Sequence, residues 1–474
     1  MATIKNQASH SVFWSAVERF STQGVQFVLG MIIARFLLPS DYGTIAMLSI
    51  FMAIAQTFID GGFINALIQK KQCSQQDYST VFFFNIFMSI GLYGILYLCA
   101  PWIANFYNEK LLTQVMRVIG LTLIINSLGI VQQAKLTIEL NFKQQAIASF
   151  IAVLISGIVG VMLAYQGFGV WTLVIQSLTS NLLRVILLWI FAHWKPLPYF
   201  SKNSFTTMFS FGSRLLLSSL LHTTYTNLYS LVIGKRFAPI ELGLYNRATT
   251  IAQFPSNNLA TVIVRAIYPI QCRIQDDTPA LKELFIKYLR MSCYIIFPLM
   301  TILCVLAEPL VKIILTEKWL PAVPLIQILC LAYMWDPIMK INNSLLNVKG
   351  RSDYFLYAEI IKKIVALIIL IVTLQFNVQI MCLGLILYAL ADMLIISLYV
   401  RKTINITIKE QIKALFPILM LSVILGLVSH ITIILTNNPW IQLLGGFTTG
   451  SITYLGISHY LNLNELNTLL HFKL

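Results

Sequence analysis

The chain has 474 residues, of which 58% are hydrophobic and only 11% are charged, and its formal net charge is +15. Soluble domains carry about 25% charged residues, so this composition excludes a soluble protein with an ordinary core. It indicates a protein whose surface lies mostly in lipid.

Apolar runs long enough to cross a bilayer as helices recur along the whole chain. We expect fourteen transmembrane spans, of which the fourth and tenth are the most polar. In chain order they cover residues 11–36, 42–68, 80–105, 111–132, 146–166, 169–192, 209–234, 246–270, 286–307, 323–346, 356–376, 379–400, 412–435 and 440–460.

The basic residues between spans alternate in density along the chain. Most of them fall in the segments that share a side with the N-terminus, as the excess of Lys and Arg in cytoplasmic loops predicts. We therefore expect both termini in the cytoplasm, and the basic balance gives no reason to predict nucleic-acid binding. Residues 1–10 have no apolar core, so no cleavable signal is expected. The seven cysteines show no CxxC spacing, which predicts neither a metal site nor a disulfide framework.

Two patterns of proline, glycine and charged residues repeat at an offset of about 200 residues. Pro39, Asp41 and Gly43 recur as Pro239, Glu241 and Gly243, and Pro101 to Lys110 recurs as Pro309 to Lys318. Six spans separate corresponding points, so the halves are parallel repeats. We expect an all-α polytopic protein with an N-lobe (1–205), a C-lobe (206–405) and two accessory helices (406–474), the lobes facing each other across a cleft. The Pro and Gly residues predict tight turns that close the first hairpin of each half.

Ionisable residues inside spans usually face a cavity or a partner, and this chain has many. Several bases lie on polar helical stripes in the cytoplasmic half of their spans, which predicts a cationic cavity that holds an anionic head group. The predicted binding residues are Arg19, Arg214, Arg265, Lys362 and Lys363, with the polar residues Gln23, Gln26 and Asn258. The alternative interpretation is structural: the arginines snorkel to the surface, and Lys362 or Lys363 pairs with Glu359.

Two embedded carboxylates, Asp60 and Asp392, have no obvious partner one turn away in the sequence. They are candidates for coupling transport to H⁺ or Na⁺, and no other cofactor is expected. Asp60 precedes Gly61 and Gly62, so it could instead brace a bend.

Several segments resemble bacterial polysaccharide transporters of the Wzx (O-antigen flippase) kind, within the multidrug/oligosaccharidyl-lipid/polysaccharide exporter superfamily. These segments include ARFLLPSDYG (34–43), DGGFINALIQ (60–69), APWIANFY (100–107), GFGVW (167–171), GKRFAPIELGLYNRA (234–248), TEKW (316–319) and VKGRSDYF (348–355). The resemblance implies fourteen helices, alternating access, and a polyprenyl-pyrophosphate-linked oligosaccharide as substrate. It also implies membrane lipids as surroundings, and a pathway with a polysaccharide polymerase and glycosyltransferases.

Two rival functions fit a polytopic chain. A multidrug antiporter of the same superfamily would favour an acidic pocket for cations, and the embedded bases argue against it. A membrane polysaccharide polymerase would need catalytic groups on a sizeable outer loop. The predicted outer loops are short and carry no such groups, so no catalytic residue and no enzyme activity is predicted.

Overall fold

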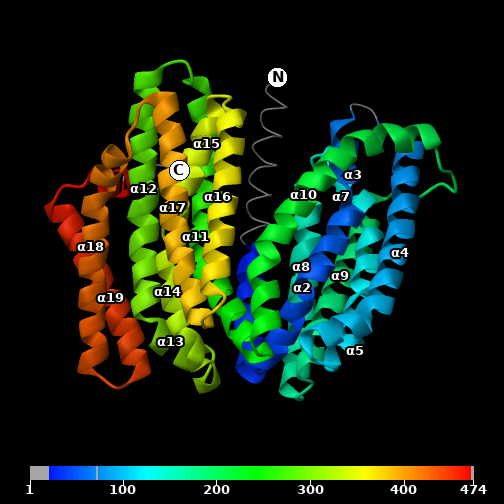
Figure 1. Cartoon of the computed structure of the whole chain (residues 1–474), viewed down its shortest axis with the longest axis horizontal. Helices are drawn as coiled ribbons and strands as arrows, with labels where there is room; N and C mark the ends of the chain where they lie inside the picture. The colour runs from blue at the N-terminus through cyan, green and yellow to red at the C-terminus, as the bar shows by residue number, and fades with distance from the viewer. Residues whose placement is uncertain (1–20, 71–72, 471–474) are drawn as a thin grey trace. The chain divides into compact units, whose positions relative to one another are not determined.

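The computed structural model describes residues 21–70 and 73–470, and its regular elements in that part of the chain are all helices (Figure 1). Nine helices or runs of consecutive helices in these residues are long and apolar enough to cross a membrane. The chain is therefore an all-α, multi-pass membrane protein. Each predicted span from 42–68 onward coincides with a helix or a run of helices.

The chain forms two compact units, which meet between Gly243 and Leu244. The first unit contains a helix over residues 21–36 and then α2 (Pro39–Asp60), α3 (Phe63–Gln69), α4 (Gln75–Tyr107), α5 (Leu111–Ile119), α6 (Leu121–Ser127), α7 (Ile130–Ile138), α8 (Phe142–Tyr165), α9 (Val170–Ala192) and α10 (Lys202–Arg236). Phe63, Leu67, Phe82 and Trp194 form an aromatic-rich core in it.

The second unit begins inside α11 (Pro239–Arg273). It continues with α12 (Thr278–Val305), α13 (Ala307–Ile314), the 3₁₀ helix η1 (Glu317–Ala322), α14 (Val323–Tyr333), α15 (Asp336–Val348), α16 (Ser352–Thr373), α17 (Val378–Ile404), α18 (Ile408–Leu435), α19 (Pro439–Tyr460) and α20 (Asn464–Leu470). The helix α10 belongs to the first compact unit, which ends at Gly243. The lobe boundaries at 205 and 405 rest on the sequence repeat and stay predictions.

The fourth and tenth predicted spans correspond under the repeat, and both are broken helices. The fourth divides into α5, α6 and α7, with breaks beside Gly120 and Gly129. The tenth divides into α14 and α15, where Pro337 lacks the N–H that would bond to the carbonyl of Tyr333. A break satisfies fewer of its own backbone groups, which is why both segments carry more polar residues.

The repeated Pro-x-acid-x-Gly pattern lies at two helix starts. Pro39 and Pro239 are the first residues of α2 and α11, where a missing N–H costs nothing. Asp41 completes the first turn of α2 by accepting from the backbone N–H of Leu38 at 2.9 Å. The connections are tight, as predicted, with only Leu37 and Leu38 between helices in the first case. The prediction was wrong in one respect, because the Pro and Gly residues belong to the following helix and not to the turn.

The second repeated pattern places a residue with positive φ at matching positions of the two halves. Seven residues after Pro101, Asn108 ends α4 with φ 57°, and seven residues after Pro309, Thr316 has φ 80°. Positive φ is rare for a β-branched residue. The two halves thus keep a positive φ at this position, although ψ differs, being 34° at Asn108 and 169° at Thr316.

Candidate functional site

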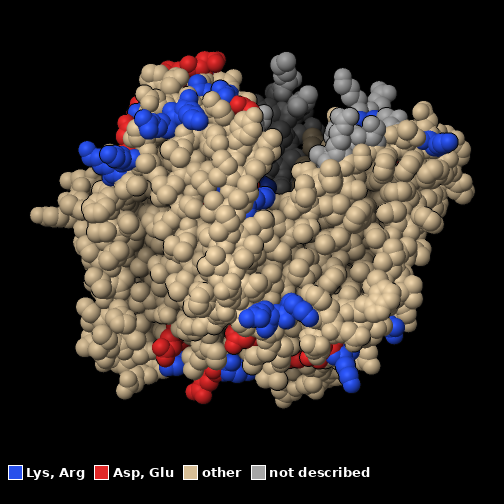
Figure 2. Space-filling view, in the orientation of Figure 1, with Lys and Arg blue, Asp and Glu red and all other residues tan. Residues whose placement is uncertain are grey.

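Charged side chains are distributed unevenly over each unit. Lys and Arg gather near the helix ends, and most of the visible surface between those ends carries no charge (Figure 2). Charges at membrane depth are costly, so the ones that the structure places inside the helical units need a physical reason.

Lys362 is the most deeply buried base among the candidates, with 2% of its surface exposed. It lies on α16, and its ammonium is 2.5 Å from Glu359 and 3.1 Å from Asp392 on α17. Asp392 is itself only 6% exposed. Two carboxylates thus surround one ammonium in the interior of the second unit, and the arrangement joins α16 to α17.

Lys363 completes this cluster at 3.6 Å from Glu359. The predicted alternative of Glu359 pairing at i,i+3 and i,i+4 is therefore what the structure contains. In this arrangement Lys362 has its charge already balanced, and a phosphate would have to displace a carboxylate to reach it.

A second polar cluster links α11 to the broken helix α14–α15. Ser256 donates to the free carbonyl of Tyr333 at 2.7 Å and to Asp336 at 3.2 Å. In return, Lys340 donates to the backbone carbonyl of Asn257 at 3.0 Å, to the side-chain oxygen of Asn257, and to the hydroxyl of Thr261 at 2.9 Å. These bonds satisfy groups that the proline break leaves open.

Arg265 differs from the bases above. It lies exposed on α11, and no ion pair joins it to any carboxylate that the structure describes. Asn258, seven residues earlier on the same helix, is buried and donates to the carbonyl of Phe254 at 2.9 Å. Arg265 therefore retains free donors, whereas the amide of Asn258 has one donor already engaged.

The predicted residues of the first unit are only partly described. Gln23 and Gln26 lie on the helix 21–36, with Gln23 half-buried and Gln26 exposed. Arg19 lies outside the described residues. Arg214 is on α10, and its side chain also lies outside the described part.

Asp60 and Asp392 were chosen because neither has an obvious partner one turn away, and this is wrong for Asp60. Asp392 has Lys362 beside it, on a helix that the sequence did not connect to it. Asp60 accepts a hydrogen bond from Gln56, one turn earlier on α2, at 2.9 Å. Gln56 in turn accepts from Asn126 at 3.3 Å. The partner of Asp60 is neutral, and no described base forms an ion pair with it.

One contact joins two of the segments that resemble polysaccharide transporters, and the sequence did not predict it. Arg247 of GLYNRA is 6% exposed, and its guanidinium lies 5.8 Å from the ring centre of Trp319 in TEKW. Trp319 is fully buried. Arginine and tryptophan in two neighbouring quoted segments were a usable signal for such a stacking pair. Among the described residues, no group of three or more His, Cys, Asp or Glu could hold a metal.

The chain matches the family model "Polysaccharide biosynthesis protein" over residues 32–324. It is 26% identical over 360 residues to the teichuronic acid biosynthesis protein TuaB of Bacillus subtilis (strain 168), covering 75% of this chain and 74% of that one. It is 27% identical over 342 residues to the lipopolysaccharide biosynthesis protein WzxC of Escherichia coli (strain K12), covering 72% and 70%.

Solved structures share the fold at low identity. The lipid II flippase MurJ in an inward closed conformation superposes with a TM-score of 0.78 at 14% identity, covering 95% of this chain and 98% of that one. An inward-facing multidrug MATE transporter of the MOP superfamily gives 0.60 at 12% identity, covering 83% and 98%. Since the family model matches more than half of the residues, the chain belongs to the polysaccharide biosynthesis protein family.

Proposed function

We propose that this protein is a flippase. It moves a polyprenyl-pyrophosphate-linked oligosaccharide from the cytoplasmic to the outer leaflet of the bacterial inner membrane, for a surface polysaccharide such as O-antigen, capsule or exopolysaccharide. The family match supports a place in polysaccharide biosynthesis, and the relatives are named for teichuronic acid, lipopolysaccharide and succinoglycan pathways. The fold shared with a lipid II flippase is compatible with this substrate class.

The observation that carries the proposal is that Arg265 is exposed on α11 and forms no ion pair with a described carboxylate. An arginine in a membrane helix is costly unless a partner neutralises it, and among the described carboxylates none does so. Its planar fork donates two parallel hydrogen bonds to a phosphate. We assign Arg265 to the pyrophosphate of the substrate, with Arg19 and Arg214 as further predicted ligands.

The remaining predicted residues take secondary roles in this proposal. Lys362 and Lys363 reach the substrate only in a conformation that releases their carboxylates, because Glu359 and Asp392 hold them here. Gln23, Gln26 and Asn258 would supply polar contacts to the glycan. A polymerase and glycosyltransferases would act before and after transport, and this chain itself would perform no catalytic step.

Coupling to H⁺ or Na⁺ is part of the same proposal. Moving one charge across the membrane gains about 2.3 kcal/mol per 100 mV, which is enough to drive a cycle. Asp60 is better suited to the carrier role than Asp392, because its partner Gln56 is neutral whereas Asp392 already holds an ammonium.

The test is the appearance of lipid-linked glycan on the outer leaflet in cells that produce Arg265→Ala, Arg265→Lys or wild-type protein. A hydrogen bond to a charged group contributes about 1.5–3 kcal/mol, so Arg265→Ala should reduce substrate affinity about ten- to a hundredfold. Arg265→Lys keeps the charge without the fork and should retain partial activity.

Arg273→Ala provides the control, since Arg273 is an exposed base at the end of the same helix. Protein level and membrane insertion are measured in parallel. Normal transport by Arg265→Ala at a normal protein level would remove the phosphate assignment.

A further inference from the structure

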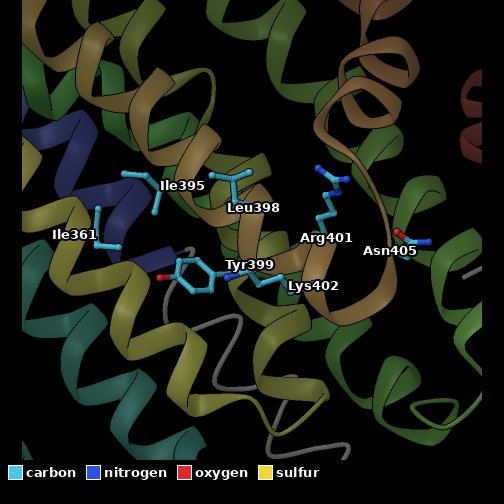
Figure 3. Close-up of a pocket in the computed structure, with 7 residues that line it drawn as sticks. All are labelled: Ile361, Ile395, Leu398, Tyr399, Arg401, Lys402 and Asn405. Atoms are coloured by element: carbon cyan, nitrogen blue, oxygen red, sulfur yellow. The ribbon is translucent and has the colours of Figure 1, made fainter.

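A pocket of about 460 Å³ opens on the second unit between the middle of α16 and the C-terminal part of α17, where α17 leads into the linker to α18 (Figure 3). Its size is within the usual range for small-molecule sites. Its lining comes from α16, α17 and the residue that ends α17: Ile361, Ile395, Leu398, Tyr399, Arg401, Lys402 and Asn405. None of these residues belongs to the clusters described above.

The pocket is apolar at one end and polar at the other. Ile361 and Leu398 are 41% and 55% exposed, and Ile395 lies beside Leu398 in Figure 3. From Ile395 to Asn405 the lining extends about 15 Å along α17 at the helical rise of 1.5 Å per residue. Such a length accommodates much of an acyl chain below a head group.

Two bases form the polar rim. Arg401 and Lys402 are both exposed, and no described carboxylate forms an ion pair with either of them. Two other bases on the same side are neutralised: Lys282 lies 3.0 Å from Glu410, and Arg351 lies 2.7 Å from Asp353. The rim therefore carries two positive charges that an anion from outside the chain can balance.

The rings of Tyr354 and Tyr399 indicate the depth of this rim in the membrane. Arg351 lies 3.6 Å from the ring centre of Tyr354, that ring is 5.5 Å from the ring of Tyr399, and Lys402 lies 5.3 Å from the Tyr399 centre. Tyrosine is enriched at membrane–water interfaces. The two rings thus indicate that the rim lies at head-group level, on the side to which the distribution of basic residues assigns the cytoplasm.

We propose that this pocket binds one anionic phospholipid of the cytoplasmic leaflet. Arg401 and Lys402 hold the phosphodiester, the amide of Asn405 contacts the head group, and one acyl chain lies along Ile361, Ile395 and Leu398. Basic pockets between transmembrane helices on the cytoplasmic side recognise acidic head groups by the same charge complementarity. The inference concerns a bound lipid and does not rest on the proposed function.

The experiment uses the purified full-length protein in a neutral detergent, titrated with phosphatidylglycerol or phosphatidylcholine. The rise of the melting temperature with lipid concentration gives an apparent Kd. Each base near the membrane surface is worth about a fivefold change in affinity. R401Q/K402Q should therefore weaken phosphatidylglycerol binding about 30-fold and leave the weak effect of phosphatidylcholine unchanged.

K409Q/K413Q is the matched control, because it removes two exposed lysines from the adjacent start of α18. It should change the apparent Kd less than twofold. An equal loss in the control would show that surface charge alone attracts the lipid, and unchanged binding by R401Q/K402Q would show that these bases do not bind it. Either result overturns the proposal.

Filling the apolar part tests the acyl chain separately. Leu398→Trp should abolish the phosphatidylglycerol effect without a change of charge, and Ile361→Trp provides a second variant if the first lowers the lipid-free melting temperature. Glycerol phosphate, which has the head group without chains, should not compete. If it competes as well as the lipid, the site binds free phosphate. If polyprenyl pyrophosphate displaces the lipid at lower concentration, the pocket serves the transported substrate, and the phospholipid assignment is wrong.

Discussion

A Cβ atom on Gly43 would overlap the carbonyl oxygen of Pro239, so the backbone at the start of α11 packs directly against this glycine. The contact is reciprocal, because a Cβ atom on Gly243 would overlap the carbonyl oxygen of Pro39. In each repeat the Pro begins the helix and the Gly follows one turn later. The repeated sequence pattern is thus a mutual contact between the two repeats' helix starts.

Gly43→Ala and Gly243→Ala should each destabilise the protein. The obstructing atoms are backbone, which cannot rotate away as a side chain can, and overpacking costs about 1–3 kcal/mol. The melting temperature of each variant in detergent measures this. Gly91→Ala, on α4 with no atom within 4 Å of the added Cβ, is the control and should melt no lower than wild type. A Gly43→Ala protein that melts with the wild type would contradict the contact.

The Lys362–Asp392 pair should show strong coupling in a double-mutant cycle. Removing one partner of a buried ion pair leaves an uncompensated charge and costs about 3–5 kcal/mol, whereas replacing both by neutral residues costs much less. We therefore expect Lys362→Met, which leaves Asp392 without a base, to lower the melting temperature strongly. Asp392→Asn leaves Lys362 paired with Glu359 and should lower it less, and the double variant should recover most of the Lys362→Met loss. Additive losses would mean that the two residues act separately.

Asp60→Asn should preserve the fold and remove coupling. The carbonyl of Asn can still accept the hydrogen bond from Gln56, so only the charge and the titratable proton are lost. In proteoliposomes with an imposed H⁺ or Na⁺ gradient, we expect the variant to lose gradient-dependent transport. Glu139→Gln, which removes a half-exposed carboxylate at the end of α7, should transport as wild type. Gradient-dependent transport by Asp60→Asn would exclude Asp60 as the carrier.

Thr316→Gly should stabilise the protein. Threonine at φ 80° stores about 1–3 kcal/mol of backbone strain, which glycine does not experience. Glycine also increases the entropy of the unfolded chain, so the net gain should be about 1 kcal/mol. Asn108→Gly at the equivalent position should change the melting temperature less, since Asn108 lies in the left-handed helical region, which asparagine tolerates. A lower melting temperature for Thr316→Gly would show that the threonine side chain contributes more than its strain costs.

Reporter fusions test the predicted orientation. Fusions at Lys202 and Thr403 should both report a cytoplasmic location, as should fusions at Lys5 and Lys473 in the parts of the chain outside the described residues. A periplasmic signal near Lys202 would mean that the halves are inverted, because an odd number of spans would then separate them.

Apolar runs predicted the helices well, since a bilayer requires every backbone group to be satisfied within a helix. The polarity of the fourth and tenth spans, and Pro337 in the tenth, indicated that these helices are broken. The partner of Asp60 was also within reach of the sequence, because Gln56 lies one turn earlier.

Whether each charged residue is paired or exposed could not be predicted in the same way. Lys362 and Asp392 lie on different helices, and no helical period connects them. The sequence shows that Lys362 and Arg265 are both embedded bases. Only the packing shows that one is enclosed by carboxylates and the other is exposed.

The bond from Ser256 to the carbonyl of Tyr333 has a consequence for related sequences. That carbonyl needs an outside donor only because residue 337 is a proline. A relative with any other residue there regains an amide hydrogen, and the hydroxyl at position 256 then keeps only its bond to Asp336. We therefore expect positions 256 and 337 to change together in evolution, although they lie on different helices far apart in the chain.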